Sequence, residues 1–342
     1  LMALDPKLKW SDFAILSRTK APLANVRSIL ESNGYPIRTT LERGLPFHRV
    51  REIHTVLEWL VSKEKENYRA SELLDEIKKI RLNYNSNIWW QLVDSFFENY
   101  RDETSDSILP VSRAIDRFYE FTAEQRREKV LGQGIFLSTI HSSKGMEFPH
   151  VFILDGDWGN PKSRTEWEEE RRVMYVGMTR AEETLRLMKI PSRTNPFLRE
   201  IRGDFVISRT YTGEAIENKF QNKRYELIGL DEVYMDYAGC FKQGENIHNL
   251  LACLEAGQCV TFHSKGKSIE IHNSEGGCVA KLSEKGVTKW SQRMDQIHEL
   301  RVIALLERDR DDPNEEFINR IKADQWELPI LEAVCSPSSR DP

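Results

Sequence analysis

A short polar segment after an apolar run combines residue types that could bind a nucleotide. Residues 137–148 read LSTIHSSKGMEF, and their serine and threonine hydroxyls could contact phosphate oxygens. Gly145 would let the backbone approach a ligand closely, and the Glu147 carboxylate could accept a hydrogen bond from a ribose hydroxyl. Taken alone, however, such residues more often form a polar turn, in which Glu147 would be a solvated carboxylate.

A second segment places an arginine at the end of an apolar stripe. Val173, Val176 and Arg180 are spaced three and four residues apart, which predicts a helix from whose end Arg180 projects. A permanently charged, planar guanidinium supplied across a lobe interface can stabilise charge on a transferring phosphoryl group. The alternative is an ion pair with Glu182 or Glu183 in the same helix, and the segment alone favours neither.

Buried strands and helices are expected to position both segments. The runs at 135–139 and 151–154 are apolar throughout, as a parallel sheet covered on both faces requires, and similar runs occur at 12–17 and 184–188. The segment 137–148 would then leave the carboxyl end of a strand, where open α/β sheets bind ligands. These patterns predict a doubly wound α/β lobe built from residues 1–48 and 131–202.

Two other regions have sequence patterns that differ from those of this lobe. Residues 49–130 show repeated amphipathic helical patterns, which predict a helical insert. Its Trp89-Trp90 and Phe96-Phe97 pairs could stack on bases, although aromatic residues at helical spacing are more often core. Residues 203–342 contain short strand signals separated by turns, which predict a C-terminal extension with a small β-rich module.

The cysteines are confined to the last third of the chain. There are five of them, an odd number, and no Cys-x-x-Cys pair occurs, which favours free thiols in a reducing compartment. His248, His263 and His272 lie among these cysteines, so a zinc site is possible. Because the spacings match no common zinc pattern, we assign no metal ligand from the sequence.

Composition narrows the class of protein. With 342 residues, 39% hydrophobic and 30% charged, the chain is expected to form two or three globular domains. No apolar run approaches the ~20 residues needed to span a bilayer, and no signal peptide is visible, so we expect a cytoplasmic protein without a membrane partner. The net charge of −5 does not decide for or against DNA, since a local basic stripe is enough for binding.

Taken together, the two polar segments resemble motifs V and VI of UvrD/Rep/PcrA-like superfamily 1 DNA helicases. The shared patterns are Thr-x-His-x-x-Lys-Gly-x-Glu-Phe and Tyr-Val-Gly-x-Thr-Arg-Ala, in the same order. Residues 12–37 look like the entry into that family's second motor lobe, and Gly44-Leu45-Pro46-Phe47 looks like the start of its helical insertion. The resemblance covers roughly residues 10–62 and 130–200.

This resemblance implies a RecA-like second motor lobe and assigns roles to individual residues. Arg180 would be the catalytic arginine that reaches the γ-phosphate of ATP. The residues implied for nucleotide binding are Glu147, Gly145 and Arg172, and those implied for DNA binding are Thr139, His141, Ser142 and Lys144. Implied cofactors are ATP and Mg²⁺, and the implied partner is single-stranded or partly duplex DNA, with movement in the 3′-to-5′ direction.

The sequence also departs from the family. No Gly-x-x-x-x-Gly-Lys-[Ser/Thr] loop occurs, so the phosphates and Mg²⁺ would be held by a first motor lobe of a longer parent chain. Residues 250–283 are similar to HIRAN-type DNA-end-binding modules, and a module that docks a protein partner is equally compatible. The sequence therefore supports half of a helicase motor or, alternatively, a helicase-derived module that binds DNA or protein without catalysis.

Overall fold

The computed structural model describes most of the chain in two compact units. The described residues are 7–40, 45–82, 85–128, 130–131, 134–156, 158, 163–190, 195–210, 223–313 and 318–336, so Gly44 of the insertion motif lies outside them. Unit 1 consists of Leu1–Thr40 and Val130–Lys223, and unit 2 consists of Leu41–Lys129 and Arg224–Pro342. The domain boundaries expected at residues 48, 130 and 202 stay a prediction.

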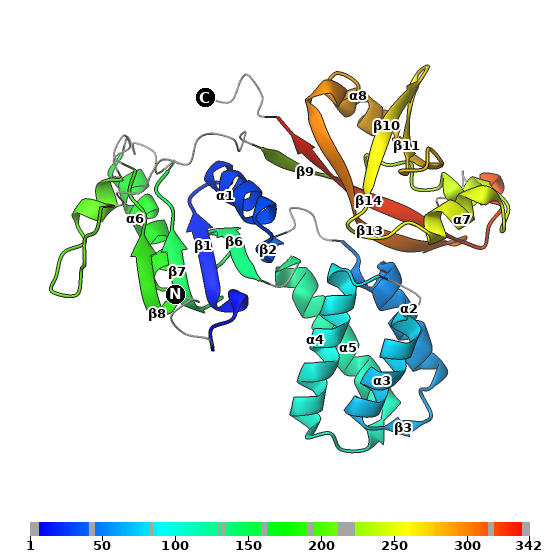
Figure 1. The fold of residues 1–342 in the computed structure, drawn as a ribbon, viewed down its shortest axis with the longest axis horizontal. Coiled ribbons are helices and arrows are strands. Elements are labelled where there is room, and N and C mark those ends of the chain that lie inside the picture. Colours follow the sequence, from blue (N-terminus) through cyan, green and yellow to red (C-terminus); the bar gives the residue numbers. More distant parts are fainter. Residues whose placement is uncertain are drawn as a thin grey trace. The chain divides into compact units, whose positions relative to one another are not determined.

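Unit 1 is built on a six-stranded sheet with the order β5-β2-β6-β1-β7-β8 (Figure 1). The strands are β1 (Phe13–Ser17), β2 (Ile37–Thr40), β5 (Val130–Leu131), β6 (Ile135–Thr139), β7 (Phe148–Ile153) and β8 (Ala181–Leu187). The five neighbours from β2 to β8 are parallel, and the two-residue β5 adds an antiparallel edge. The chain leaves this sheet after β2 and returns at β5, as the predicted insertion requires.

One long helix covers each face of this sheet. Helix α1 (Ala21–Ser32) places Val26 and Leu30 against Phe13, Ile135 and Leu137. Helix α6 (Arg164–Met178) packs on the opposite face, and its contacts there include Met174, Val173 and Val176 against Ala14, Leu16, Phe136 and Val151. Apolar side chains therefore point to both faces of the strands, which is why the runs lack alternation. The predicted α/β fold class is confirmed.

The first half of unit 2 is helical. Its helices are α2 (Arg51–Ser62), α3 (Ala70–Arg81), α4 (Ile88–Thr104) and α5 (Val111–Glu128), and the two-residue strands β3 (Asn67–Tyr68) and β4 (Leu109–Pro110) pair between them. Asn87 caps α4 by accepting hydrogen bonds from the amides of Trp89 and Trp90. Trp89, Trp90, Phe96 and Phe97 are at most 2% exposed, so they are core residues and not base-stacking platforms.

The second half of unit 2 is an antiparallel sheet with the order β12-β11-β10-β13-β14-β9. The strands are β9 (Arg224–Ile228), β10 (Cys259–Lys265), β11 (Ser268–His272), β12 (Cys278–Lys281), β13 (Ile297–Asp309) and β14 (Gln325–Cys335). Two short helices, α7 (Asn246–Ala252) and α8 (Glu284–Trp290), complete the module. The predicted β-rich C-terminal module is therefore present as a separate sheet.

A buried arginine joins the helices of unit 2 to this sheet. Arg51, at the start of α2, forms a two-pronged ion pair with Glu327 on β14. It also donates to the backbone oxygens of Leu254, at 2.6 Å, and Leu251, at 2.7 Å. The Trp89 indole adds a hydrogen bond of 2.7 Å to the Ile303 oxygen on β13. The helical insert and the β-rich module consequently share one set of buried contacts.

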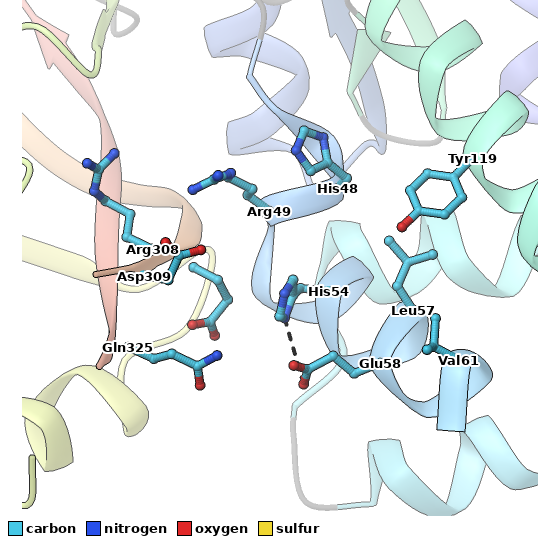
Figure 2. A pocket seen from close by; sticks show the side chains of 11 residues that line it. His48, Arg49, His54, Leu57, Glu58, Val61, Tyr119, Arg308, Asp309 and Gln325 are labelled. Atoms are coloured by element: carbon cyan, nitrogen blue, oxygen red, sulfur yellow. Dashed lines mark ion pairs between the residues drawn. The ribbon is translucent and has the colours of Figure 1, made fainter. Parts of the chain in front are cut away.

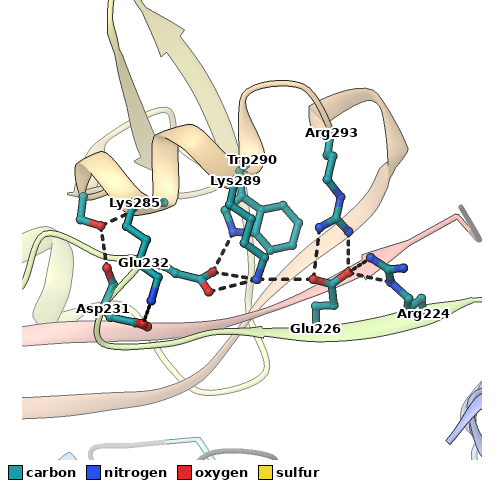
Figure 3. Close-up of polar contacts among 10 residues, drawn as sticks. Arg224, Glu226, Asp231, Glu232, Lys285, Lys289, Trp290 and Arg293 are labelled. Carbon is teal, nitrogen blue, oxygen red and sulfur yellow. Dashed lines mark hydrogen bonds and ion pairs between the residues drawn. The ribbon is translucent and has the colours of Figure 1, made fainter.

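Charges inside the β-rich module are also paired. Figure 3 shows the Glu226 carboxylate between Arg293 and Arg224, and the Glu232 carboxylate accepting from Lys289 and from the Trp290 indole. Burial opposes ionisation of Glu226, but the two arginines outweigh it and hold the pKa of this carboxyl at about 2.

In the part of the chain that the structure describes, no helix is both long and apolar enough to cross a membrane.

Candidate nucleotide and DNA site

The turn after β6 is organised by the backbone oxygen of Thr139. The amides of Ser142 and Ser143 both donate to this oxygen at 3.1 Å, and the buried Ser143 hydroxyl donates to the Ile140 oxygen at 2.9 Å. Ser143 is thus a structural residue of the turn. The side chains of His141, Ser142 and Lys144, which the sequence assigns to DNA, are all exposed.

Gly145 and Glu147 close the same loop. Gly145 has φ +87°, a conformation that favours glycine, and a Cβ atom added there would meet no atom within 4 Å. The Glu147 side chain is exposed, and no hydrogen bond or ion pair engages its carboxylate within the described residues. Both observations are compatible with a ligand approaching this part of the loop.

Arg180 lies in the turn between α6 and β8. The sequence predicts Arg180 at the end of a helix; α6 ends at Met178, and Arg180 lies two residues beyond it, in the turn. The intrahelical pair with Glu182 or Glu183 is wrong, because both glutamates lie on β8. Instead, the guanidinium donates to neutral acceptors: Val176 O at 2.9 Å, Met146 O at 3.0 Å and Thr179 Oγ1 at 3.1 Å.

This half-buried guanidinium has no anionic partner among the described residues. Two of its five N–H groups remain after the three hydrogen bonds to neutral acceptors. Other partly buried arginines differ, since Arg18 pairs with Glu170 and Arg308 with Asp236. Arg180 is therefore held in a fixed position with its charge uncompensated, which is the state in which a guanidinium can accept an external anion.

The sequence-assigned residues lie at two opposite edges of the sheet. Thr139 ends β6 beside Ser17, at the carboxyl edge of the parallel strands. Glu147 precedes β7 and Arg180 precedes β8, and the Phe148 amide donates to the Arg180 oxygen at 2.8 Å, so these two lie at the amino edge. The segment leaves the carboxyl end of β6 at Thr139, as predicted, but it then crosses the sheet, so that Glu147 and Arg180 lie at the amino edge. The reason is that β6 and β7 are parallel, so residues 140–147 must cross from one edge to the other, roughly 16 Å for a five-residue strand.

The crossing loop packs tightly against α6. Ile140 is 1% exposed, and a Cβ atom added to Gly177 of α6 would lie 2.9 Å from its Cδ1 atom. A larger residue than glycine at position 177 would force the buried Ile140 side chain to shift, and its Cβ would also lie 3.1 Å from Ile153 Cδ1. Gly177 therefore fixes the helix that precedes Arg180 against the loop that carries Glu147.

Two arginines near this site differ in what they contact. Arg172 is exposed on α6 and, within the described residues, engages no carboxylate. Arg18, directly after β1, was not singled out from the sequence, and it forms hydrogen bonds of 2.8 and 2.6 Å with Glu170. Its position at the carboxyl end of an apolar strand was the available signal. Because its charge is already paired, Arg18 anchors α6 to the sheet.

A separate cavity of about 290 Å³ lies within unit 2, between the helices and the β-rich module (Figure 2). It is lined by His48, Arg49, His54, Leu57, Glu58, Val61, Tyr119, Glu307, Arg308, Asp309 and Gln325. Burial and the neighbouring Glu327 raise the pKa of Glu307 to about 8. Arg49 and Arg308 are paired with Asp312 and Asp236, and none of the sequence-assigned site residues lines this cavity.

Comparison with known proteins matches the region that contains the site residues assigned from the sequence, Thr139 to Arg180. Residues 91–192 match the family model described as the UvrD-like helicase C-terminal domain. The ATP-dependent DNA helicase PcrA of Bacillus subtilis is 45% identical over 78 residues, which are 21% of this chain and 11% of that protein. PcrA of Staphylococcus epidermidis is 36% identical over 110 residues, or 27% of this chain and 15% of that protein. The mitochondrial ATP-dependent DNA helicase HMI1 of Saccharomyces cerevisiae is 27% identical over 143 residues, or 36% and 19%. The matched segments thus span less than a fifth of these relatives.

Proposed function

Since the chain carries a UvrD-like helicase C-terminal domain, we propose that unit 1 is the second motor lobe of an ATP-dependent DNA helicase. In this proposal ATP binds at the amino edge of the sheet, between unit 1 and a first lobe outside this chain. The assignment follows from the family match at residues 91–192 and from the chemistry of the side chains placed there.

The observation that carries the proposal is the uncompensated charge of Arg180. Its hydrogen bonds to Val176, Met146 and Thr179 fix the guanidinium without neutralising it. A charge that is already oriented costs no reorganisation when negative charge develops on a transferring phosphoryl group. We therefore assign Arg180 as the arginine finger, and Glu147, exposed at the same edge, as the carboxylate for a ribose hydroxyl.

The loop that crosses the sheet accounts for coupling between nucleotide and DNA. The half of this loop at the carboxyl edge carries hydroxyl, imidazole and ammonium groups that can contact a DNA backbone, from Thr139, His141, Ser142 and Lys144. Gly145 and Glu147 occupy its other half, which contacts Arg180 through the Met146 oxygen. A shift of the loop on nucleotide binding would therefore move the DNA-binding residues, and by family resemblance the resulting movement is 3′-to-5′.

Mg²⁺ would neutralise charge on the ATP phosphates, but the described residues of unit 1 contain no cluster of three metal-ligating side chains. Within the described residues, the one group of three clustered metal-ligating side chains is in unit 2. The Mg²⁺ ligands and the phosphate-binding loop are therefore assigned to the first lobe. Arg172, exposed on α6, is assigned a supporting role beside the phosphates.

The test is DNA-stimulated ATP hydrolysis by the full-length protein that contains this chain. We expect Arg180→Ala to lower kcat on the order of a thousandfold, because one charge contact to the transition state is lost. Arg171→Ala is the matched control: Arg171 lies on α6, the helix that precedes Arg180, but its guanidinium is 3.2 Å from the carboxylate of Glu200, so hydrolysis should stay near wild type.

Normal hydrolysis by the Arg180→Ala protein would overturn the arginine-finger assignment. A full-length protein that binds DNA but hydrolyses no ATP would instead favour the alternative, a helicase-derived binding module. For the 342-residue chain alone we expect no ATPase activity and weak, salt-sensitive binding of single-stranded DNA.

A further inference from the structure

Metal-ligating side chains gather on one face of the β10–β11–β12 sheet. Glu270 and His272 are two residues apart on β11, so both point to the same face. Cys278 on β12 pairs with His272, and His263 on β10 pairs with Glu270, so the cross-strand register brings these residues to that face too. The opposite face carries Ile269, Ile271, Val279 and Ala280, which are all buried.

Three of these side chains converge closely enough to share an ion. The ligand atoms of Glu270, His272 and Cys278 all lie within 4.8 Å of one another, and His272 Nε2 is 3.1 Å from Glu270 Oε2. Ligands of a tetrahedral zinc ion, bound at about 2.0–2.3 Å, are separated from one another by roughly 3.3–3.7 Å. Small side-chain rotations are therefore sufficient to close the three atoms around a metal.

We propose that Glu270, His272 and Cys278 form a Zn²⁺ site. A thiolate, an imidazole and a carboxylate make a mixed donor set that suits Zn²⁺, whereas Mg²⁺ and Ca²⁺ prefer oxygen ligands alone. The ion would link β11 to β12 across the turn at residues 273–277, and solvent would occupy the fourth position. The site lies in unit 2 and does not rest on the helicase proposal.

The neighbouring groups leave room for the ion. Glu270 also pairs with Lys281 at 3.1 Å and Lys265 at 3.4 Å, and these lysines compensate the carboxylate without a metal. The Lys265 side chain is 74% exposed and can move into solvent. Lys281 lies 5.0 Å from the ring centroid of Tyr237, so it keeps a cation–π contact when it releases Glu270.

Further contacts orient the cysteine and the histidine. The Tyr237 hydroxyl is 3.5 Å from Cys278 Sγ and can donate to a thiolate, and in the thiol form Sγ donates to the Ala280 oxygen at 3.5 Å. The His263 ring stacks on His272 with a centroid distance of 4.2 Å, while its Nε2 atom contacts Thr261 Oγ1 at 3.1 Å. His263 therefore supports the His272 ring as a positioning residue.

The sequence did not predict this site because its ligands do not follow a linear pattern. Glu270, His272 and Cys278 give Glu-x-His-x₅-Cys, which is not a familiar zinc spacing. The register between β11 and β12, which includes a shift between Ile271 and His272, sets the position of the cysteine.

The experiment uses the full 342-residue chain, stripped with a chelator and titrated with Zn²⁺ alone and then with Co²⁺ as a spectroscopic substitute. We expect one Zn²⁺ per chain, a thiolate-to-Co²⁺ charge-transfer band, and a higher Tm with Zn²⁺. Cys278→Ser should abolish the band and lower Zn²⁺ affinity by at least a hundredfold. Cys253→Ser, at an exposed cysteine outside the cluster, should keep both.

Glu270→Gln provides a second variant that keeps the size of the side chain and the Cys278 thiol, and it should also weaken Zn²⁺ binding. Far-UV circular dichroism of each stripped variant should match that of the stripped wild type. Wild-type protein that binds no Zn²⁺ against a weak chelator would overturn the proposal. A Cys278→Ser protein that retains both the ion and the Co²⁺ band would overturn it equally.

Discussion

Arg180 in unit 1 and Arg51 in unit 2 are both held by hydrogen bonds to backbone oxygens, but only the charge of Arg51 is neutralised by a carboxylate. Each guanidinium donates to two backbone oxygens, Met146 and Val176 for Arg180, Leu251 and Leu254 for Arg51. Arg51 also meets the Glu327 carboxylate, whereas Arg180 meets no carboxylate among the described residues. We infer that an arginine held in place by backbone oxygens has a structural role when a carboxylate of the same chain neutralises its charge. Without such a carboxylate, the guanidinium is available to bind an anionic ligand.

The largest effect that tests this comparison is the loss of stability in Arg51→Ala. The Arg51 side chain is 5% exposed and that of Glu327 is 15% exposed, so the substitution leaves a carboxylate and two oxygens without their donor. We expect the free energy of unfolding, measured with urea, to fall by about 3–5 kcal/mol. Arg180→Ala is the control and should lose no more than about 1 kcal/mol, since its acceptors are neutral.

A double variant separates the lost ion pair from lost packing. If Arg51→Met with Glu327→Gln recovers much of the stability that Arg51→Ala loses, the unpaired charge is the cause. An Arg180→Ala protein as unstable as Arg51→Ala would show that Arg180 is a structural residue, and the comparison between the two units would fail.

The pH dependence of unfolding sharpens the same comparison. Glu307 faces Glu327 across β13 and β14, and burial together with that neighbour raises the pKa of Glu307 to about 8. The folded protein thus holds a proton that the unfolded chain releases near its ordinary pKa of about 4.5. The contribution of the protonated Glu307 carboxyl to the free energy of unfolding is therefore fully present below pH 4.5 and is lost as the pH rises to about 8.

We expect Glu307→Gln to remove this slope and to be more stable than wild type at pH 9 by roughly 1–3 kcal/mol. The measurement is chemical unfolding at intervals from pH 5 to pH 9. Glu275→Gln, in an exposed turn of the same unit, should keep the wild-type slope. Parallel pH profiles for wild type and Glu307→Gln would mean that this carboxyl is ionised in the folded protein.

Gly177→Ala should have a smaller effect on stability. Alanine favours a helix over glycine by about 1 kcal/mol, but its Cβ would crowd the buried Ile140, which typically costs about 1–3 kcal/mol. We expect a net loss of about 1 kcal/mol in urea unfolding, and weaker DNA stimulation of ATP hydrolysis in the full-length protein. The Ile140→Val change should recover part of both losses in the double variant, and no recovery would argue against crowding at this contact.

The sequence predicted the parts of the fold that depend on local pattern. The fully apolar strands and the helical patterns between them sufficed for the α/β class, and residues 91–192 match the family model of the UvrD-like helicase C-terminal domain. It did not predict that Glu147 and Arg180 lie at the opposite edge from Thr139, since that follows from a crossing loop without a helix. Nor did it predict the Arg51–Glu327 pair, whose partners are 276 residues apart, because no periodicity connects them.

The smallest expected stability change belongs to Glu147→Gln. The carboxylate is exposed and, within the described residues, forms no hydrogen bond or ion pair, so the free energy of unfolding should change by no more than about 0.5 kcal/mol. If Glu147 binds a ribose hydroxyl, the amide retains an acceptor but loses the charge, so ATP affinity of the full-length protein should fall by roughly tenfold. Fluorescent-nucleotide titration measures this change in affinity, with Glu182→Gln, at an exposed position on β8, as the control. Unchanged affinity together with unchanged stability would make Glu147 a solvated loop residue. The absence of an internal partner would then not be enough to identify a ligand-binding side chain. Such a side chain must also be held in place by other hydrogen bonds, as Arg180 is and Glu147 is not.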